Sequence, residues 1–380
     1  MNRFFTKAFY TLLILTTALS VILGGQFSTF AAESETHCSA AEAFTPVKFN
    51  YQTDNKENIK VSSRFFELIF GKKENEKSND DIMLCPSGSA FGILIKEDGV
   101  TVCSSNISAI MAGDRIIQIG NKDCVECSDV YEAVRESGGA PLKIKLIRDG
   151  EEIEISATPK YSDGEYKLGI TLRSQSAGIG TITFVEPKTL AFGGLGHAVS
   201  DAESGNPVSV KSGIASGVTL GACKKGLPGK AGELSGILTK NTIGQLYRNT
   251  ECGVFGKLDS LPQGIGEAIP IAKRNEVKTG EAEIISTIKN GKTAYYTIEI
   301  TDIDYTSTGS KSFKIKVTDP TLISLTGGIV RGMSGSPIIQ NGKLVGAVTH
   351  VMVADPTEGY GIFIENMLSA SKGEAQNKAA

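Results

Sequence analysis

Glycine restricts the folds open to this chain more than any other residue, because 43 of its 380 residues are glycine. Glycine is the usual residue of tight turns, and aromatic residues make up only 7% of the chain, with no tryptophan. Hydrophobic residues still reach 40%, which is enough to build cores in two or three domains. We therefore expect a mainly β protein of short strands and tight loops.

Charge and motif spacing exclude several classes of function. The net charge of −3 argues against nucleic-acid binding, and the run GLPGKAG lacks the glycine spacing of a phosphate-binding loop. The histidines His37, His197 and His350 are widely separated, and H-E-x-x-H is absent. Cys124 and Cys127 lack the second pair that a four-thiolate zinc site needs, so ordinary thiols are favoured. We expect no metal and no cofactor.

The N-terminus indicates export. Arg3 and Lys7 precede an uncharged apolar run over residues 8–25, which predicts a hydrophobic helix. Residues 1–32 fit either a membrane anchor or a cleaved signal peptide, since the run is at the lower limit for spanning a bilayer. Residues 33–82 are polar and predict an exposed linker, which is the expected region of any self-cleavage.

A first folded domain is expected over residues 83–165. Its pattern is two strands, a loop, a third strand, a helix and a strand pair that turns at Asp149–Gly150. Ser128 is a suitable N-cap for the helix, and Val130 and Val134 lie on one face of it.

That order of elements resembles a PDZ domain, an α/β partly open barrel. The specific pieces are AGDRII at residues 112–117 and the loop before FGILI. The resemblance implies that Phe91, Gly92, Ile93 and Leu94 form a strand that binds a peptide tail, from this chain or a partner, by β-augmentation. A degenerate PDZ fold that serves only as a spacer is the alternative.

The second domain is expected over residues 168–370, with a polar tail over 371–380. Its strand-like runs are mostly β-branched, and it contains the stretch RGMSGSPIIQNGKLVGAVTH. A glycine-rich elbow that carries Ser334, followed by a hairpin turn at Asn341–Gly342, is typical of a nucleophile on a loop. A simple turn without chemistry is the alternative.

A serine nucleophile needs a base, and two histidines could supply it. His197 follows Gly-Gly-Leu-Gly, which leaves its ring room on a loop and favours it as the general base. His350 stands in an expected strand, where a place lining the substrate site is favoured over the role of base.

The six residues Gly-Met-Ser-Gly-Ser-Pro resemble the Gly-x-Ser-Gly-Gly-Pro elbow of chymotrypsin-like proteases. That resemblance implies an oxyanion hole formed by the backbone N–H groups of Gly332 and Ser334. Ser336 stands where the elbow has its second glycine, and it is the runner-up nucleophile.

Longer stretches resemble the stage IV sporulation protein B family of serine endopeptidases: AGIGTITF, LGHAVSD, the elbow region and DPTEGYGIFIENML. The resemblance implies a chymotrypsin-like double β-barrel after the PDZ domain. It also implies a catalytic triad of His197, Asp319 and Ser334, with Asp319 placed 15 positions before the serine.

The residues alone leave the acid open, since Asp201, Asp302 and Asp304 are also plausible partners for the imidazole.

The family resemblance also implies a role. Its members cleave themselves and then cut a membrane-associated regulatory protein in the space around the forespore of an endospore-forming bacterium. That cut triggers intramembrane processing of a late sigma factor. The resemblance thus implies an exported protein, at the forespore membrane through its N-terminal segment or in the intermembrane space, with no nucleic-acid partner. The alternatives are an inactive PDZ-containing scaffold and an envelope quality-control protease.

Overall fold

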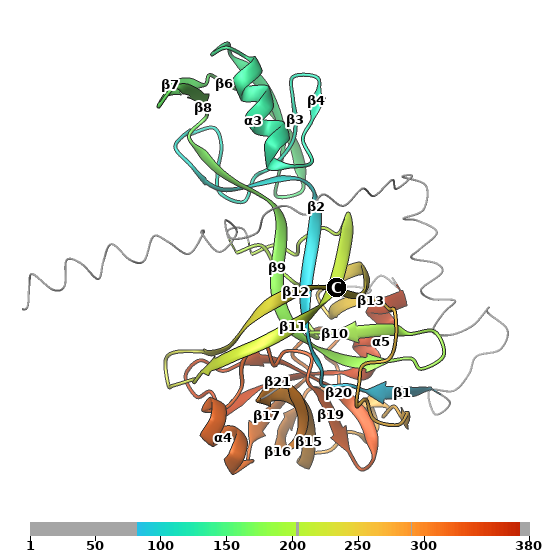
Figure 1. The fold of residues 1–380 in the computed structure, drawn as a ribbon. Helices are drawn as coiled ribbons and strands as arrows, with labels where there is room; N and C mark the ends of the chain where they lie inside the picture. The colour runs from blue at the N-terminus through green and yellow to red at the C-terminus, as the bar shows by residue number, and fades with distance from the viewer. Residues whose placement is uncertain (1–81, 203–204, 290, 373–380) are drawn as a thin grey trace, which may run out of the picture. The chain divides into compact units, whose positions relative to one another are not determined.

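Figure 1 shows the computed structural model, which describes residues 82–202, 205–289 and 291–372. All of them belong to one compact unit, Lys56–Ala380. The predicted N-terminal helix, nearly all of the predicted linker and most of the polar tail lie outside the described residues. Within the described ranges, no helix is both long and apolar enough to cross a membrane.

Six strands form a first closed barrel. They run in the order β9, β10, β13, β12, β11 and β2, and the pairing of β2 with β9 completes the ring. Their bounds are β2 (Ala90–Ser105), β9 (Ile170–Val185), β10 (Ala191–Gly194), β11 (Ser212–Lys224), β12 (Gly232–Thr250) and β13 (Gly253–Leu258). Phe91 and Phe192 meet edge to face inside it, with ring centroids 5.7 Å apart.

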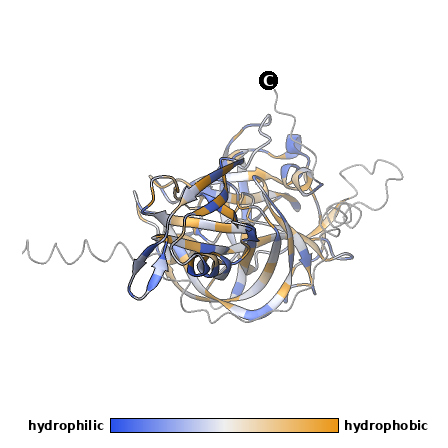
Figure 2. Cartoon of the chain, turned by 90° about the horizontal axis from the view of Figure 1, so that it is seen from above, coloured by the Kyte–Doolittle hydropathy of each residue, from blue (hydrophilic) through white to orange (hydrophobic). Residues whose placement is uncertain are grey.

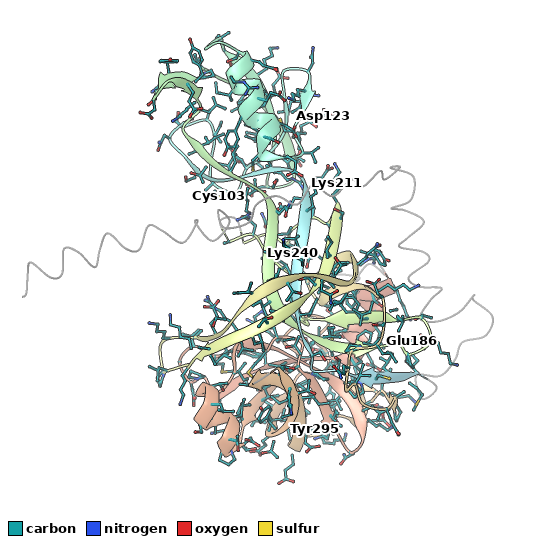
Figure 3. All side chains as sticks on the ribbon, in the orientation of Figure 1. Cys103, Asp123, Glu186, Lys211, Lys240 and Tyr295 are labelled. Atoms are coloured by element: carbon teal, nitrogen blue, oxygen red, sulfur yellow. The ribbon has the colours of Figure 1, made fainter. Side chains whose placement is uncertain are left out.

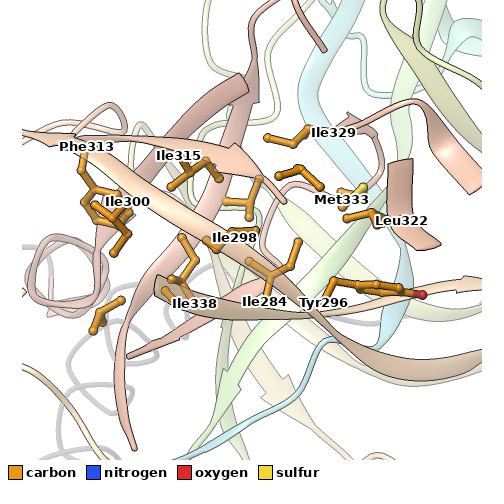
Figure 4. Packing of buried hydrophobic residues seen from close by; sticks show 14 of the residues in the cluster. Ile284, Tyr296, Ile298, Ile300, Phe313, Ile315, Leu322, Ile329, Met333 and Ile338 are labelled. Atoms are coloured by element: carbon orange, nitrogen blue, oxygen red, sulfur yellow. The ribbon is translucent and has the colours of Figure 1, made fainter. Parts of the chain in front are cut away.

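Six more strands form a second closed barrel. They are β15 (Gly280–Lys289), β16 (Lys292–Ile303), β17 (Phe313–Val317), β21 (Glu358–Phe363), β20 (Lys343–Val351) and β19 (Pro337–Gln340). Alternate residues of β16, namely Tyr296, Ile298 and Ile300, are buried in the core shown in Figure 4. This period of two is what a strand with one inward face requires, and strands in Figure 2 carry both hydrophobic and hydrophilic bands. The predicted mainly β, chymotrypsin-like double barrel is confirmed.

Short elements lie outside the two rings of strands. They are β1 (Met83–Pro86), β14 (Ile269–Pro270), a 3-10 turn (Arg274–Glu276), α4 (Pro320–Thr326), β18 (Val330–Arg331) and α5 (Ile364–Lys372). The strand β1 pairs with both β9 and β14, and β18 pairs with β12 of the first barrel. The chain therefore returns from the second barrel to the first immediately before the serine elbow.

A separate small core lies between β2 and β9 in the sequence. The outer ends of these two strands pair with each other, and the sheet continues from β2 through β3 (Arg115–Ile119), β5 (Leu142–Arg148) and β6 (Glu151–Ala157). The helix α3 (Cys127–Glu136) covers it, with β4 (Lys122–Asp123) and a hairpin of β7 (Lys160–Ser162) and β8 (Glu165–Lys167) beside it. We call residues 100–173 the inserted unit.

Two local predictions in the inserted unit can be compared with the structure. Val130 and Val134 are buried on one face of α3, as predicted. Ser128 is not the N-cap as predicted: the helix begins at Cys127, Glu126 is the N-cap, and the side chain of Asp129 in the first turn accepts the N–H of Glu126 at 2.8 Å. A carboxylate in the first turn also interacts favourably with the helix dipole, which a serine hydroxyl cannot do.

The inserted unit is not a domain that precedes the protease. Residues 90–96 of β2 belong to the first barrel, the strand then leaves it, and β9 returns to it after residue 173. The predicted ranges 83–165 and 168–370 therefore do not follow the physical boundary, because the barrel begins before the insertion. The sequence pattern alone assigned the whole of β2 to the first domain, whereas its two ends belong to different units.

The predicted peptide-binding strand is corrected by these pairings. Ile93 lies opposite Gly178 of β9 and Ala215 of β11, and its neighbours Phe91, Gly92 and Leu94 lie in the same interior strand. Both edges are occupied, so no backbone groups remain for β-augmentation there. Among the described residues, positions 170–173 of β9 pair with β2 alone, so the inserted unit has its edge at those residues.

Charged side chains join the inserted unit to the first barrel. The Arg173 guanidinium of β9 pairs with the buried carboxylates of Glu97 and Asp201, with Nε and the Glu97 Oε1 3.9 Å apart. Just outside the inserted unit, Lys211, labelled in Figure 3, pairs with the exposed carboxylate of Asp98 at 3.1 Å. Asp201 stands four residues after His197, so the first of these contacts reaches the loop that carries the expected base.

Candidate active site

The serine elbow lies between β18 and β19, and its shape depends on glycine. Gly332 and Gly335 have φ of +98° and +96°, in the left-handed region that only glycine adopts easily. A Cβ on Gly335 would come within 2.0 Å of the Thr181 carbonyl oxygen and 2.5 Å of the Leu195 nitrogen. The half-buried Ser334 stands between these two glycines, as the sequence predicted.

Strand β9 of the first barrel holds the elbow in place. The Thr181 hydroxyl donates to the Gly332 carbonyl at 2.8 Å, and the Thr183 hydroxyl donates to the Gly335 carbonyl at 2.8 Å. The Thr181 amide also donates to the Ser334 carbonyl at 3.0 Å. The sequence analysis did not identify either threonine. Two threonines at a spacing of two in an otherwise apolar strand could have indicated buried hydroxyls that need hydrogen-bond partners.

The amide groups of the elbow divide into two sets. Those of Met333, Gly335 and Ser336 donate to backbone carbonyls at 2.8 to 3.1 Å. Outside the strand ladders, the amides of Gly332 and Ser334 donate to no described residue. These are the two N–H groups predicted to form the oxyanion hole, and their role stays a prediction.

His197 follows the end of β10, in a loop that packs closely against β20. Gly196 has φ of +70°, and a Cβ there would meet the Thr349 methyl at 2.8 Å. The His197 Nδ1 lies 2.8 Å from the Ala198 carbonyl oxygen. Because a carbonyl only accepts, Nδ1 carries the proton and Nε2 carries the lone pair that a general base uses. Burial lowers the pKa of His197, and the Ala198 carbonyl offsets part of that effect.

His350 lies beside His197. The centroids of the two rings are 4.9 Å apart and the ring planes are inclined by 38°. The His350 Nδ1 is buried and has no hydrogen-bond partner among the described residues. Burial is the largest cause that lowers the pKa of His350 to about 4, followed by the charges of His197 and Lys311. His350 is therefore neutral at pH 7.

The hydroxyl of Ser334 lies next to the residue that precedes His350. Its Oγ donates to the carbonyl oxygen of Thr349, the residue before His350, at 2.8 Å. The structure therefore brings Ser334, His197 and His350 together where the first barrel meets the elbow and β20. Among the described residues the Ser334 hydroxyl forms no hydrogen bond to His197, and catalytic hydrogen bonds often form only when substrate is bound.

The predicted acid, Asp319, has a different partner in this structure. It is the N-cap of α4, and its Oδ1 accepts the Leu322 N–H at 2.8 Å. In the described part of the chain, no hydrogen bond or ion pair joins it to His197. Its role as the triad acid stays a prediction.

The other aspartates that the sequence left open also have partners of their own. Asp201 pairs with Arg173, Asp302 with a lysine of β17 at 3.1 Å, and Asp304 accepts from a threonine hydroxyl at 2.6 Å. Over the described ranges, none of them forms a hydrogen bond to His197.

The runner-up nucleophile is enclosed. Ser336 is fully buried, and its hydroxyl donates to the Ser286 hydroxyl of β15 at 3.0 Å. A substrate carbonyl cannot reach a side chain in that position. Of the two serines in the elbow, the geometry favours Ser334.

The described residues contain no group of three or more His, Cys, Asp and Glu side chains placed to hold a metal ion. No disulfide joins any two of the six described cysteines. Burial raises the pKa of Cys124 to about 11 and also raises that of Cys127, so both thiols are protonated at neutral pH.

Comparison with known proteins gives a family match that covers more than half of the chain. The family model described as SpoIVB peptidase S55 matches residues 164–368. A putative zinc metalloprotease, LL2128 of Lactococcus lactis subsp. lactis (strain IL1403), is 27% identical over 112 residues, which are 27% of this chain and 26% of that protein. This chain thus spans about a quarter of that relative's length.

Two solved structures show weaker likenesses. The HtrA-type protease AlgW with tripeptide is 14% identical and covers 51% of this chain and 55% of its own, with a TM-score of 0.31. The active form of the Rv3671c protease from M. tuberculosis is 12% identical and covers 52% of this chain and 75% of its own, with a TM-score of 0.32. Scores this low add nothing to the fold that the strand pairings show.

Proposed function

The chain belongs to the SpoIVB peptidase S55 family of serine endopeptidases, and from that membership we propose that it carries out a sporulation-specific cleavage. It first cleaves itself in the N-terminal linker. It then cuts a membrane-associated regulatory protein in the intermembrane space of the forespore, and this cut triggers intramembrane processing of a late sigma factor. The observation that best supports proteolysis is the Ser334 elbow beside His197.

The proposed reaction uses groups already near one another. The Ser334 Oγ attacks the substrate carbonyl while its proton passes to the His197 Nε2, which later returns it to the leaving amine. The amides of Gly332 and Ser334 stabilise the oxyanion. Preorganised donors of this kind contribute about 3 to 4 kcal/mol each to lowering the barrier.

We also propose Asp319 as the triad acid, on the family pattern. In the structure its carboxylate caps α4 and the Ala198 carbonyl contacts the His197 Nδ1. To act as the acid, the Asp319 carboxylate must leave the Leu322 amide when substrate binds. It must then replace the Ala198 carbonyl as the acceptor of the His197 Nδ1 proton. The carboxylate then stabilises the imidazolium that forms during acyl transfer.

The partners are proposals of the same kind. The N-terminal apolar segment would hold the chain at the membrane near its substrate. A peptide tail, from this chain or a partner, would pair with the edge at residues 170–173 rather than with the enclosed strand around Ile93. That edge belongs to the strand that also holds the serine elbow.

A complementation experiment tests the role. An endospore-forming bacterium that lacks its own family member would express this chain or the Ser334→Ala variant, with Ser336→Ala as the matched control. Processing of the late sigma-factor precursor would be followed by immunoblot. We expect the unmutated chain and Ser336→Ala to restore processing and Ser334→Ala to fail. Restoration by Ser334→Ala would instead support a non-catalytic scaffold.

A further inference from the structure

We propose that His197 and His350 together bind a zinc ion that reversibly stops proteolysis. This inference rests on the proposed function, since it describes regulation of the same active site. It assigns His350 a role beyond that of a residue near the substrate. The two imidazoles come from different barrels, so the site exists only when both barrels are folded and packed.

The ring separation fits a shared ion. Zinc lies about 2.0 to 2.1 Å from an imidazole nitrogen, so two imidazoles on one tetrahedral zinc have centroids roughly 5 Å apart. The centroids of His197 and His350 are 4.9 Å apart. The observed separation therefore matches that of two imidazoles bound to the same ion.

One nitrogen of each ring is available. The His197 Nδ1 is taken by the Ala198 carbonyl, which leaves Nε2 with its lone pair. The His350 Nδ1 is buried and unpartnered within the described ranges. An unsatisfied buried polar atom costs about 1 to 3 kcal/mol, and a metal bond would satisfy this one. Neutral imidazole is the form that ligates zinc.

The rest of the coordination shell determines how tightly zinc binds. No third His, Cys, Asp or Glu of the described chain completes the site, so water would fill the remaining coordination positions. Two protein nitrogens give a reversible site rather than a structural one. A zinc ion on the His197 Nε2 removes the lone pair that accepts the Ser334 proton, so the occupied enzyme cannot form its acyl intermediate.

The first test measures binding without activity. Calorimetric titration of zinc would use the full chain with Ser334→Ala, which prevents self-cleavage. His350→Gln and His197→Gln would be added to this background separately, with His37→Gln as the matched histidine control. We expect each of the first two changes to weaken binding at least tenfold and His37→Gln to leave it unchanged. Unchanged affinity in His350→Gln would overturn the proposal.

Cysteine thiols could also bind zinc, so the ligand type needs its own readout. Cobalt(II) in place of zinc gives visible bands for nitrogen and oxygen ligands and strong near-ultraviolet charge-transfer bands for thiolates. We expect a spectrum without thiolate bands at one equivalent, and its loss in His350→Gln. A thiolate spectrum that His350→Gln leaves intact would assign the metal to cysteines and contradict the proposal.

The second test separates this inference from the proposed function. Self-cleavage of the unmutated chain would be measured with zinc and then with excess chelator. We expect zinc to stop it and the chelator to restore it. Zinc-insensitive proteolysis would overturn the inference alone. A chain with no proteolysis under any condition would overturn the proposed function, while the calorimetry would still decide whether the histidine pair binds zinc.

Discussion

At the scale of single residues, the reaction depends on the proton of His197. The Ala198 carbonyl fixes which ring nitrogen carries it, at 2.8 Å, and burial lowers the pKa of the ring. Burial favours the neutral imidazole, and the Ala198 contact keeps the proton on Nδ1, so that Nε2 keeps its lone pair; that hydrogen bond offsets part of the burial effect on the pKa. The base is therefore ready in the free enzyme without a carboxylate beside it.

This arrangement predicts the pH dependence of activity. The base works only when deprotonated, so kcat/KM falls as pH drops through the pKa of His197 in the free enzyme. Because burial lowers that pKa, we expect the midpoint of the acid limb below the ordinary value of about 6.5. Measurement of kcat/KM on a peptide substrate against pH checks this. A midpoint above about 7 would mean that a carboxylate already contacts the ring in the free enzyme.

The role of Asp319 has a sharp test. Asparagine caps a helix about as well as aspartate, so Asp319→Asn should keep the bond to Leu322 and leave the melting temperature unchanged. It cannot stabilise an imidazolium, so we expect kcat to fall roughly 10³- to 10⁴-fold. Asp319→Ala would lose both the cap and the charge. Activity of Asp319→Asn within about threefold of the unmutated enzyme would show that Asp319 is only a helix cap.

The contrast between Ser334 and Asp319 shows what sequence can predict about a site. Ser334 lies between glycines that a sharp backbone bend requires, and the structure gives both of them positive φ as expected. Asp319 precedes a proline at the start of a helix, where an aspartate satisfies local capping rules without any role in catalysis. Which atoms meet across two barrels is a long-range property that local pattern does not contain.

At the scale of elements, the serine elbow depends on its contact with β9. The buried hydroxyls of Thr181 and Thr183 hold it from one side, and Gly335 passes so close to β9 that no side chain fits. Strand β9 therefore sets the position of the nucleophile. It does so without contributing a reacting group.

Two glycine substitutions separate crowding from backbone strain. Gly335 and Gly342 both have positive φ, but a Cβ on Gly342 meets nothing within 4 Å. We expect Gly342→Ala to cost about 1 to 2 kcal/mol through strain alone. Gly335→Ala adds a clash with the backbone of Thr181, so we expect at least about 3 kcal/mol and loss of activity. Denaturant unfolding measures both, and equal costs would contradict the close contact.

Turns were easier to predict than strand partners. The hairpin turns at Asp149–Gly150 and Asn341–Gly342 have positive φ at both positions, as their sequences predict. The segment that begins at Phe91 was predicted to be an edge strand and is an interior one. Its apolar alternation is the same in either place, and only the pairing with β11, which is distant in the sequence, distinguishes them.

At the scale of the whole molecule, the inserted unit and the first barrel share two continuous strands. Arg173 stands on one of them, and its partners Glu97 and Asp201 are 6% and 8% exposed. Asp201 lies in the loop of His197. A change at the edge of the inserted unit therefore has a short physical route to the base, through one strand and one buried ion pair.

Removal of Arg173 should destabilise the protein. Arg173→Ala removes the guanidinium that pairs with two buried carboxylates, and breaking a buried ion pair from one side costs about 3 to 5 kcal/mol. Lys211→Ala is the matched control, because it breaks the exposed pair with Asp98 and should cost less than about 1 kcal/mol. Thermal unfolding of both variants checks the difference. A loss of the same size in each would argue against a buried link.

The most direct measurement follows self-cleavage of the full-length chain beside its Ser334→Ala and Ser336→Ala variants, by gel and by intact mass. Loss of a catalytic serine lowers kcat by about 10⁶, whereas loss of the Ser336 hydrogen bond to Ser286 costs about 1 kcal/mol of stability. We expect the unmutated chain and Ser336→Ala to lose an N-terminal segment at a site before residue 83, and Ser334→Ala to stay intact. Equal trimming of all three forms, with no hydrolysis of added substrate, would contradict the assignment of Ser334 as the nucleophile.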